Sequence, residues 1–119
     1  MLFRSTLVHV YSSERVWFSR WTGASLDRMP PASDCPDLET LKTNWRSLES
    51  RVRAFVADLG DSGVARVFAY QTFDGRRMEN PFWQMAQHLV NHGSYHRGQV
   101  TTLLRQLGAA PARSMDLIA

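Results

Sequence analysis

The sequence predicts an all-α helical bundle with a small β-hairpin insertion, formed as a single domain over residues 1–119. Three long segments carry apolar residues at alternating steps of three and four, which is the spacing of a helix with one buried face. Between the second and third segments, aromatic and β-branched residues precede Asp74-Gly75, a pair typical of hairpin turns. With 44% hydrophobic and 21% charged residues, a chain of 119 residues can form one core and has no room for a second domain.

The first helix is predicted to run from about Leu2 to Trp21, with Gly23 closing it. Its apolar stripe consists of Phe3, Leu7, Val10, Trp17 and Trp21. Glu14 falls on the same stripe, either as a boundary carboxylate paired with an arginine or as an acceptor that orients a metal-ligating imidazole. His9 lies about 120° from the centre of the stripe, so periodicity alone places it at the surface or the boundary.

A loop rich in proline, aspartate and serine is expected over residues 22–36, and it contains the only cysteine, Cys35. A single cysteine excludes an internal disulfide and suits a reducing compartment. Because no histidine is close to it in sequence, Cys35 is interpreted as incidental rather than nucleophilic. The second helix should begin with Pro36 and the acidic Asp37 and Glu39, and end at Gly60. Its unbroken stripe is interpreted as core and consists of Leu38, Leu41, Trp45, Leu48, Val52, Phe55 and Leu59.

Residues 64–79 favour strand, and a two-residue turn at Asp74-Gly75 would fold them into a hairpin that connects the second and third helices. Tyr70 and Phe73 are expected to serve packing rather than substrate contact.

The third helix is predicted over residues 80–108, with Asn80 as its cap and Pro81 in its first turn. Gly108, followed by Pro111, should end it. Its stripe is expected to face a partner and consists of Phe82, Ala86, Leu89, Gly93, His96, Val100, Leu103 and Leu107.

Three of the four histidines lie four residues apart on this helix. His96 falls inside the stripe, His92 is displaced by roughly 60° and His88 by about 100° from its centre. Two imidazoles one turn apart can share one metal ion with little rearrangement. The ordinary alternative is that they are polar residues bonded to neighbouring side chains.

Residues 91–92 and 95–99 read N-H followed by Y-H-R-G-Q, and an apolar helix continues after them. This resembles the last long helix of the DinB (damage-inducible) family, which carries a histidine pair in an N-H-x-x-x-H-R-G-Q setting. The family's earlier motif, L-x-H-x-x-x-x-E-x-x-W, is matched less specifically, at Leu7, His9, Glu14 and Trp17. The resemblance extends from about residue 2 to the tail at residues 114–118. Family members usually begin with a further helix, for which this chain has almost no residues, so a DinB-like four-helix bundle lacking its first helix is expected.

The resemblance implies that His9, His92 and His96 bind one divalent metal ion, with zinc or nickel as the expected metal. His88 is interpreted as a residue at the edge of the pocket rather than a fourth ligand, because its direction diverges from that of His96 by about 80°. The family signature includes Tyr95, Arg97 and Gln99, which suggests that these residues contact the metal ligands or lie at an interface. Each also has a plain structural use at the boundary or surface of a bundle.

Relatives of this family include thiol S-transferases and metal-dependent hydrolases, so the resemblance implies a small-molecule substrate and a low-molecular-weight thiol. A thiol S-transferase is preferred, because no carboxylate has a motif-based claim to be the base of a hydrolase. The alternatives are a hydrolase and a metal-binding or stress-associated protein without turnover. A haem bundle is disfavoured, because haem does not require His92 and His96 one turn apart.

The net charge of +3 comes with scattered arginines, so no nucleic-acid partner is indicated. No apolar run approaches 18 residues and no signal peptide is recognisable, which predicts a cytoplasmic protein without a membrane partner. Strong apolar stripes on three helices, without a fourth to cover them, predict either a homodimer or a chain that lacks its natural N-terminal helix.

Overall fold

The computed structural model describes residues 2–109, so Pro111 and the tail at residues 114–118 lie outside the described part of the chain. As predicted, the fold is helical with one two-stranded antiparallel hairpin. The main elements are α1 (Leu2–Trp21), α2 (Leu38–Leu59), β1 (Val67–Gln71), β2 (Arg77–Pro81) and α3 (Phe82–Gln106). Two short 3-10 helices, Ala32–Asp34 and Asp61–Gly63, lie in the connections that flank α2. None of the described helices combines the length and the apolar character needed to cross a membrane.

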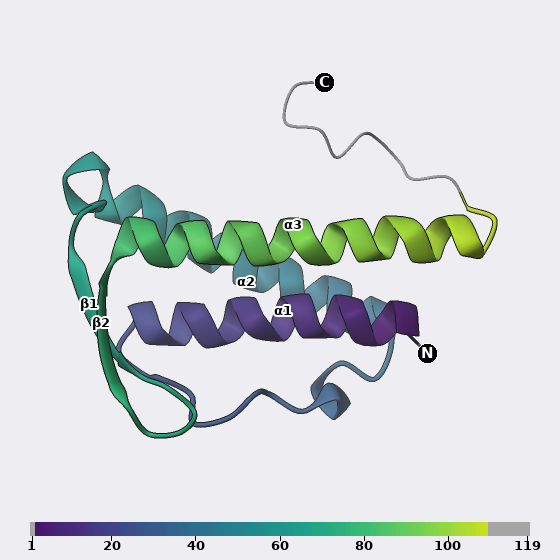
Figure 1. Cartoon of the computed structure of the whole chain (residues 1–119), viewed down its shortest axis with the longest axis horizontal. Coiled ribbons are helices and arrows are strands. Elements are labelled where there is room, and N and C mark those ends of the chain that lie inside the picture. The colour runs from purple at the N-terminus through teal and green to yellow at the C-terminus, as the bar shows by residue number, and fades with distance from the viewer. Residues whose placement is uncertain (1, 110–119) are drawn as a thin grey trace.

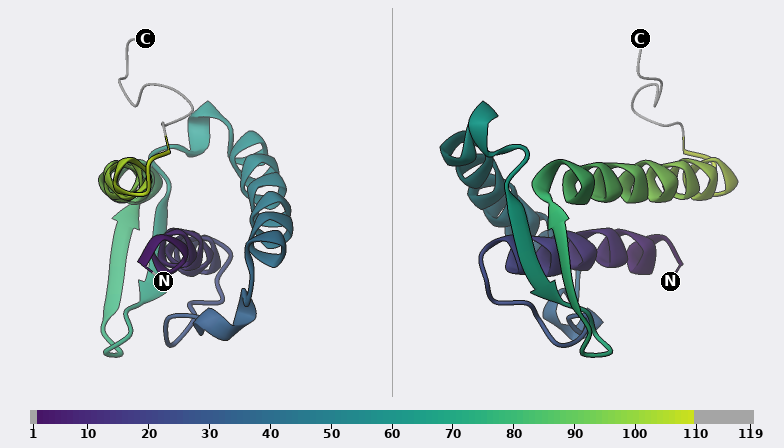
Figure 2. Two further views of the ribbon diagram at one scale, coloured as in Figure 1. Left: turned by 90° about the vertical axis from the view of Figure 1, so that its right-hand side faces the viewer. Right: turned by 60° about the vertical axis from the view of Figure 1, so that its left-hand side comes forward.

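Helix α1 lies at the centre of the arrangement. It runs antiparallel to α3, while α2 crosses behind it at an angle and the hairpin closes one end (Figure 1). Seen end-on, α1 lies between α2 and α3, and these two outer helices diverge from each other (Figure 2). This position explains why burial on α1 extends beyond the single predicted stripe. The side chains buried outside that stripe include Val8, Tyr11, Ser12, Ser13, Val16, Ser19 and Arg20.

Two groups of buried side chains form the core. One joins α1, the 22–36 loop and the first half of α2, and consists of Val8, Tyr11, Cys35, Leu41 and Leu48. The other joins the end of α1, the hairpin and the start of α3, and consists of Trp21, Phe68, Tyr70, Phe82 and Met85. Apolar burial of this kind supplies most of the free energy that keeps helices packed. Cys35 is therefore a core side chain that fixes the loop to α2, in keeping with a structural rather than a nucleophilic role.

The hairpin turn is longer than the predicted two-residue turn. The Thr72 N–H donates to the Arg76 carbonyl, and the Gly75 N–H donates to the Thr72 carbonyl. Residues 73–75 therefore form a three-residue loop between Thr72 and Arg76, the last hydrogen-bonded pair of the hairpin. The last loop residue, Gly75, has a φ of 84°, in the left-handed region. A type I turn followed by a left-handed glycine is the usual three-residue hairpin loop, and its Asp-Gly pair resembles that of the two-residue turn.

The start of α3 also differs from the prediction. Asn80 does not cap the helix but pairs with Phe68 in the hairpin, and Pro81 is the cap rather than the first helical residue. The first free N–H groups of α3 instead donate to backbone carbonyls before β1: Phe82 to Arg66 at 2.8 Å, and Trp83 to Val64 at 3.0 Å. Because these carbonyls satisfy the helix terminus, α3 is joined directly to the hairpin.

The end of α3 agrees with the prediction. Gly108 has a φ of 80°, and the N–H groups of Gly108 and Ala109 donate to the carbonyls of Arg105 and Leu104. This is the Schellman arrangement that commonly ends a helix at glycine. The predicted stripe is wrong at Leu107, which is 67% exposed, and it omitted the buried Met85.

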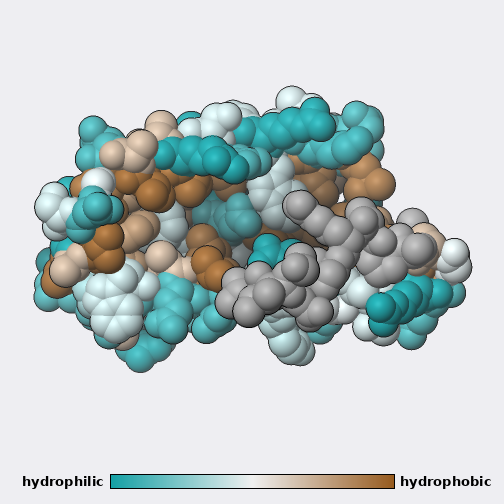
Figure 3. All heavy atoms as spheres, turned by 90° about the horizontal axis from the view of Figure 1, so that it is seen from above, coloured by the Kyte–Doolittle hydropathy of each residue, from teal (hydrophilic) through white to brown (hydrophobic). Residues whose placement is uncertain are grey.

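On the face seen from above in Figure 1, hydrophobic side chains gather in a band between hydrophilic margins (Figure 3). Val90 and Trp83 of α3 and Val56 of α2 are among the large apolar side chains that remain exposed. We predict that a second copy of the chain buries such surface, because contiguous apolar surface is costly in water. Sedimentation equilibrium should give the mass of two chains, and a stable monomer at micromolar concentration would contradict this prediction.

Candidate metal centre

The three histidines singled out by the sequence come together between α1 and α3. His9 extends from α1, and His92 and His96 extend from successive turns of α3. One ring nitrogen from each lies within 4.8 Å of the others, and no further histidine, cysteine or carboxylate among the described residues belongs to this group. All three side chains are partly accessible, so an ion and a small ligand could reach them.

The spacing of the ring nitrogens fits one shared ion. His92 Nε2 lies 3.2 Å from His9 Nε2 and 3.1 Å from His96 Nε2. Two ligands of a tetrahedral ion with metal–nitrogen bonds of about 2.0–2.1 Å lie about 3.3 Å apart, and the same bonds at a right angle give about 2.9 Å. The observed distances fall between these values. Three imidazoles that point their Nε2 atoms at one another form a donor set for a divalent cation such as zinc or nickel.

Gln99 fixes the orientation of His96. Its side-chain oxygen lies 2.7 Å from His96 Nδ1. An amide oxygen only accepts hydrogen bonds, so Nδ1 carries the hydrogen and Nε2 keeps its lone pair toward the other two histidines. Metal-ligating histidines are commonly oriented in this way through their second nitrogen. The family signature suggests a role for Gln99 around the ligands or at an interface, with a polar boundary residue as the plain alternative. Its i, i+3 relation to His96 is the signal that places the two side chains together.

The environment of the site favours the neutral forms of His9 and His92. Burial lowers the pKa of His9 below its ordinary value of 6.5, and the neighbouring His96 lowers it further. Burial likewise lowers the pKa of His92, with added effects from His96, His9 and His88. Protons therefore compete less with a cation for these nitrogens at neutral pH.

His88 lies beside the centre without joining it. Its ring packs 5.0 Å from Trp17 and 6.3 Å from the ring of His92, centroid to centroid. The exposed Tyr95 ring lies 5.1 Å from that of His96. These two side chains therefore flank the three histidines on the accessible side of α3.

Glu14 does not orient an imidazole, which corrects one of the two interpretations made from the sequence. It lies about 140° around α1 from His9, and its carboxylate accepts a hydrogen bond of 2.8 Å from Trp45 Nε1 on α2. The positive charge of Arg97 acts on the same carboxylate. Arg97 lies over the buried Gly93, where a Cβ would come within 3.5 Å of its Nη1 atom. Glu14 is thus a carboxylate of α1 at the boundary with α2 and α3, near the charge of Arg97. This is close to the other interpretation made from the sequence, a boundary carboxylate paired with an arginine.

Two comparisons with known proteins bear on the family of this chain. The sequence model of the DinB family matches residues 1–117. Protein DinB of Bacillus subtilis (strain 168) is 26% identical over 113 residues, which cover 89% of this chain. The aligned region spans 64% of that relative, a little under two-thirds of its length.

The partly buried Glu14 generates a pH-dependent prediction. Burial is the largest effect on its pKa and raises it above the ordinary value of 4.5, against the opposing hydrogen bond from Trp45 and the charge of Arg97. When a carboxyl group has a higher pKa in the folded state than in the unfolded state, the free energy of unfolding falls as the pH rises from 4.5 through the folded-state pKa. Glu14→Gln keeps an acceptor for Trp45 and removes this penalty. The stability of the Gln variant relative to the parent should therefore increase between pH 4 and pH 7.

Urea unfolding of both proteins at the two pH values measures this difference, because all other titrating groups are shared. Glu14→Ala serves as the control, since it leaves the Trp45 N–H without an acceptor and should cost about 1–3 kcal/mol. A Gln variant whose relative stability falls as pH rises would show that Arg97 outweighs burial.

Proposed function

Since the chain belongs to the DinB family, we propose that it binds one divalent metal ion, zinc or nickel, through His9, His92 and His96 and acts as a thiol S-transferase. The observation that carries the proposal is the pair of Nε2 distances of 3.2 and 3.1 Å at His92. These distances match the spacing of ligands on one ion, and the ligands come from two helices that meet only in the folded chain.

A divalent ion held by three neutral imidazoles keeps its full charge and acidifies a thiol or a water that it binds. Residues of the chain prepare the three imidazoles to bind the ion. Gln99 holds His96 in the tautomer that presents Nε2. The partial burial of His9 and His92 keeps them unprotonated at neutral pH.

A thiol substrate suits this site better than water does. Activated water must pass a proton to a base during hydrolysis, and no carboxylate among the described residues belongs to the histidine group. Glu14, the one carboxylate in the family motif, is bonded to Trp45 on another side of α1. A thiol needs only to lose its proton to solvent before its sulfur bonds to an electrophilic carbon. The leaving group then departs with its bonding electrons, so no oxidant or reductant is required.

A hydrolase and a metal-binding protein without turnover are the alternatives to be tested. A haem protein is disfavoured further by the geometry. Axial nitrogens on opposite sides of one iron would lie about 4 Å apart, at twice a metal–nitrogen bond of about 2 Å, whereas His9 and His92 approach to 3.2 Å.

We predict that His96→Ala abolishes stoichiometric metal binding, because it removes one of three ligands and the one that Gln99 orients. His88→Ala is the matched control on the same helix and should retain one ion per chain, because His88 lies outside the group. Elemental analysis of the purified proteins measures both. Equal loss of metal from the two variants would show that the ligand set is misassigned.

The thiol step makes a separate prediction. Addition of a low-molecular-weight thiol to cobalt-substituted protein should change the visible absorption spectrum, because sulfur and water differ as ligands. The metal-free protein should fail to conjugate the same thiol to an electrophile. Cobalt spectra that stay unchanged across a panel of cellular thiols would reject the S-transferase in favour of the hydrolase or the protein without turnover.

A further inference from the structure

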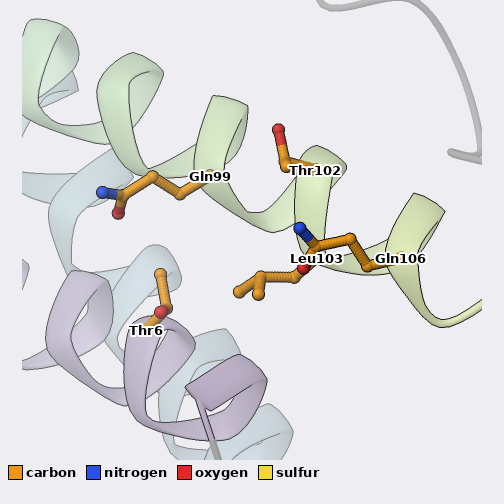
Figure 4. A pocket seen from close by; sticks show the side chains of 5 residues that line it. All are labelled: Thr6, Gln99, Thr102, Leu103 and Gln106. Carbon is orange, nitrogen blue, oxygen red and sulfur yellow. The ribbon is translucent and has the colours of Figure 1, made fainter.

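A cavity of about 370 Å³ lies between the first turns of α1 and the last turns of α3. Its lining residues are Thr6, Gln99, Thr102, Leu103 and Gln106 (Figure 4). Thr6 precedes His9 by three residues, and Gln99 follows His96 by three residues. The cavity therefore begins one helical turn from the histidine centre. Its volume is in the range of sites that hold small molecules.

The described lining residues carry no charge, and most of the surface that they expose to the cavity is apolar. The oxygen of Gln99 is bonded to His96, which leaves the two N–H donors of its amide nitrogen to serve another group. Gln106 offers a second side-chain amide further along α3. Thr6 and Leu103 point into the space between the helices, whereas Thr102 points away (Figure 4), and its hydroxyl bonds to the Gly98 carbonyl. The cavity thus combines two side-chain amides with a mainly apolar surface to which Leu103 contributes.

The distance along α3 sets the length of ligand that fits. Ten residues separate His96 from Gln106, which corresponds to about 15 Å at 1.5 Å per residue. A ligand with its reacting atom at the histidines must extend by this amount to reach Gln106. A compact thiol would fill only the near end.

We propose that this cavity binds the non-reacting part of the thiol: an extended, uncharged tail with amide or hydroxyl groups, directed so that the sulfur lies at the three histidines. The inference rests on the proposed S-transferase function and adds the class of thiol. Hydrogen bonds from Gln99 and Gln106 would select such a tail, and Leu103 would pack against its carbon chain. A tail with carboxylates is disfavoured, because the described lining has no cation to pair with a desolvated charge.

The test uses two uncharged thiols that share the same reactive end. Pantetheine carries a long tail with two amides and two hydroxyls, and N-acetylcysteamine is its truncated form. Titrations of cobalt-loaded protein, followed by the absorption spectrum, should half-saturate at a concentration at least about tenfold lower for pantetheine, as expected for two or more additional hydrogen bonds. Glutathione, which carries two carboxylates, should not share this advantage.

Gln106→Ala should reduce the preference for pantetheine roughly fivefold, the effect of one lost neutral hydrogen bond, and leave N-acetylcysteamine unchanged. Gln106 is exposed in the last turn of α3, so the fold should tolerate the change. Gln87→Ala, at an exposed position on the same helix, is the matched control and should alter neither titration. Gln99 is unsuitable for this test because it also orients His96.

A second measurement separates failure of the cavity from failure of the proposed function. S-Methyl pantetheine, which cannot form a thiolate, is added to metal-free protein, and the backbone amide NMR signals of Thr6 and Gln106 should shift. Equal titrations of both thiols with no NMR shifts would overturn the cavity assignment and leave the thiol function standing. NMR shifts without any cobalt response would overturn the thiol and leave the cavity as a binding site. Absence of both responses would overturn both.

Discussion

The antiparallel packing of α1 against α3 is the constraint on which the histidine centre depends. His9 and His92 are 83 residues apart in sequence, yet their Nε2 atoms lie 3.2 Å apart. A slip of one helical turn would move one helix by about 5.4 Å along the other and separate the ligands. Aromatic packing opposes such a slip at the hairpin end, where the rings of Trp21 and Phe82 lie 4.9 Å apart. The hairpin adds a second constraint, because backbone carbonyls before β1 cap the start of α3.

The three helices could be predicted from the sequence, because each has apolar residues at helical spacing and a glycine near its end. The errors occur where tertiary contacts replace local signals. Asn80 is a good cap by residue type, but pairing with Phe68 holds it in the hairpin. The burial of Ser12 and Ser13 follows from the central position of α1, which no hydrophobic pattern reveals. Local spacing therefore identified the elements, while their contacts decided how the elements begin and which faces are covered.

The candidate centre was predictable to a different degree for each residue. The four-residue spacing of His92 and His96 places them on adjacent turns of one helix, so their proximity follows from helix geometry. His9 lay outside the apolar stripe of its own helix, and only its likeness to a family motif drew attention to it. Glu14 belongs to the same motif but bonds to Trp45, whereas Gln99 orients His96. The motifs thus identified the residues around the site, and side-chain contacts were needed to show what each of these residues does.

The capping of α3 by the carbonyls of Arg66 and Val64 also has a consequence for the order of folding. These carbonyls can accept hydrogen bonds from α3 only when the segment before β1 has reached the start of that helix. The hairpin must therefore form together with α3, and it stabilises this last helix. During synthesis, His92 leaves the ribosome 83 residues after His9, and long-range contacts of this kind form slowly because they close a large loop. A cation that needs all three imidazoles would then bind only the nearly finished native state, and it would stabilise that state over every earlier one.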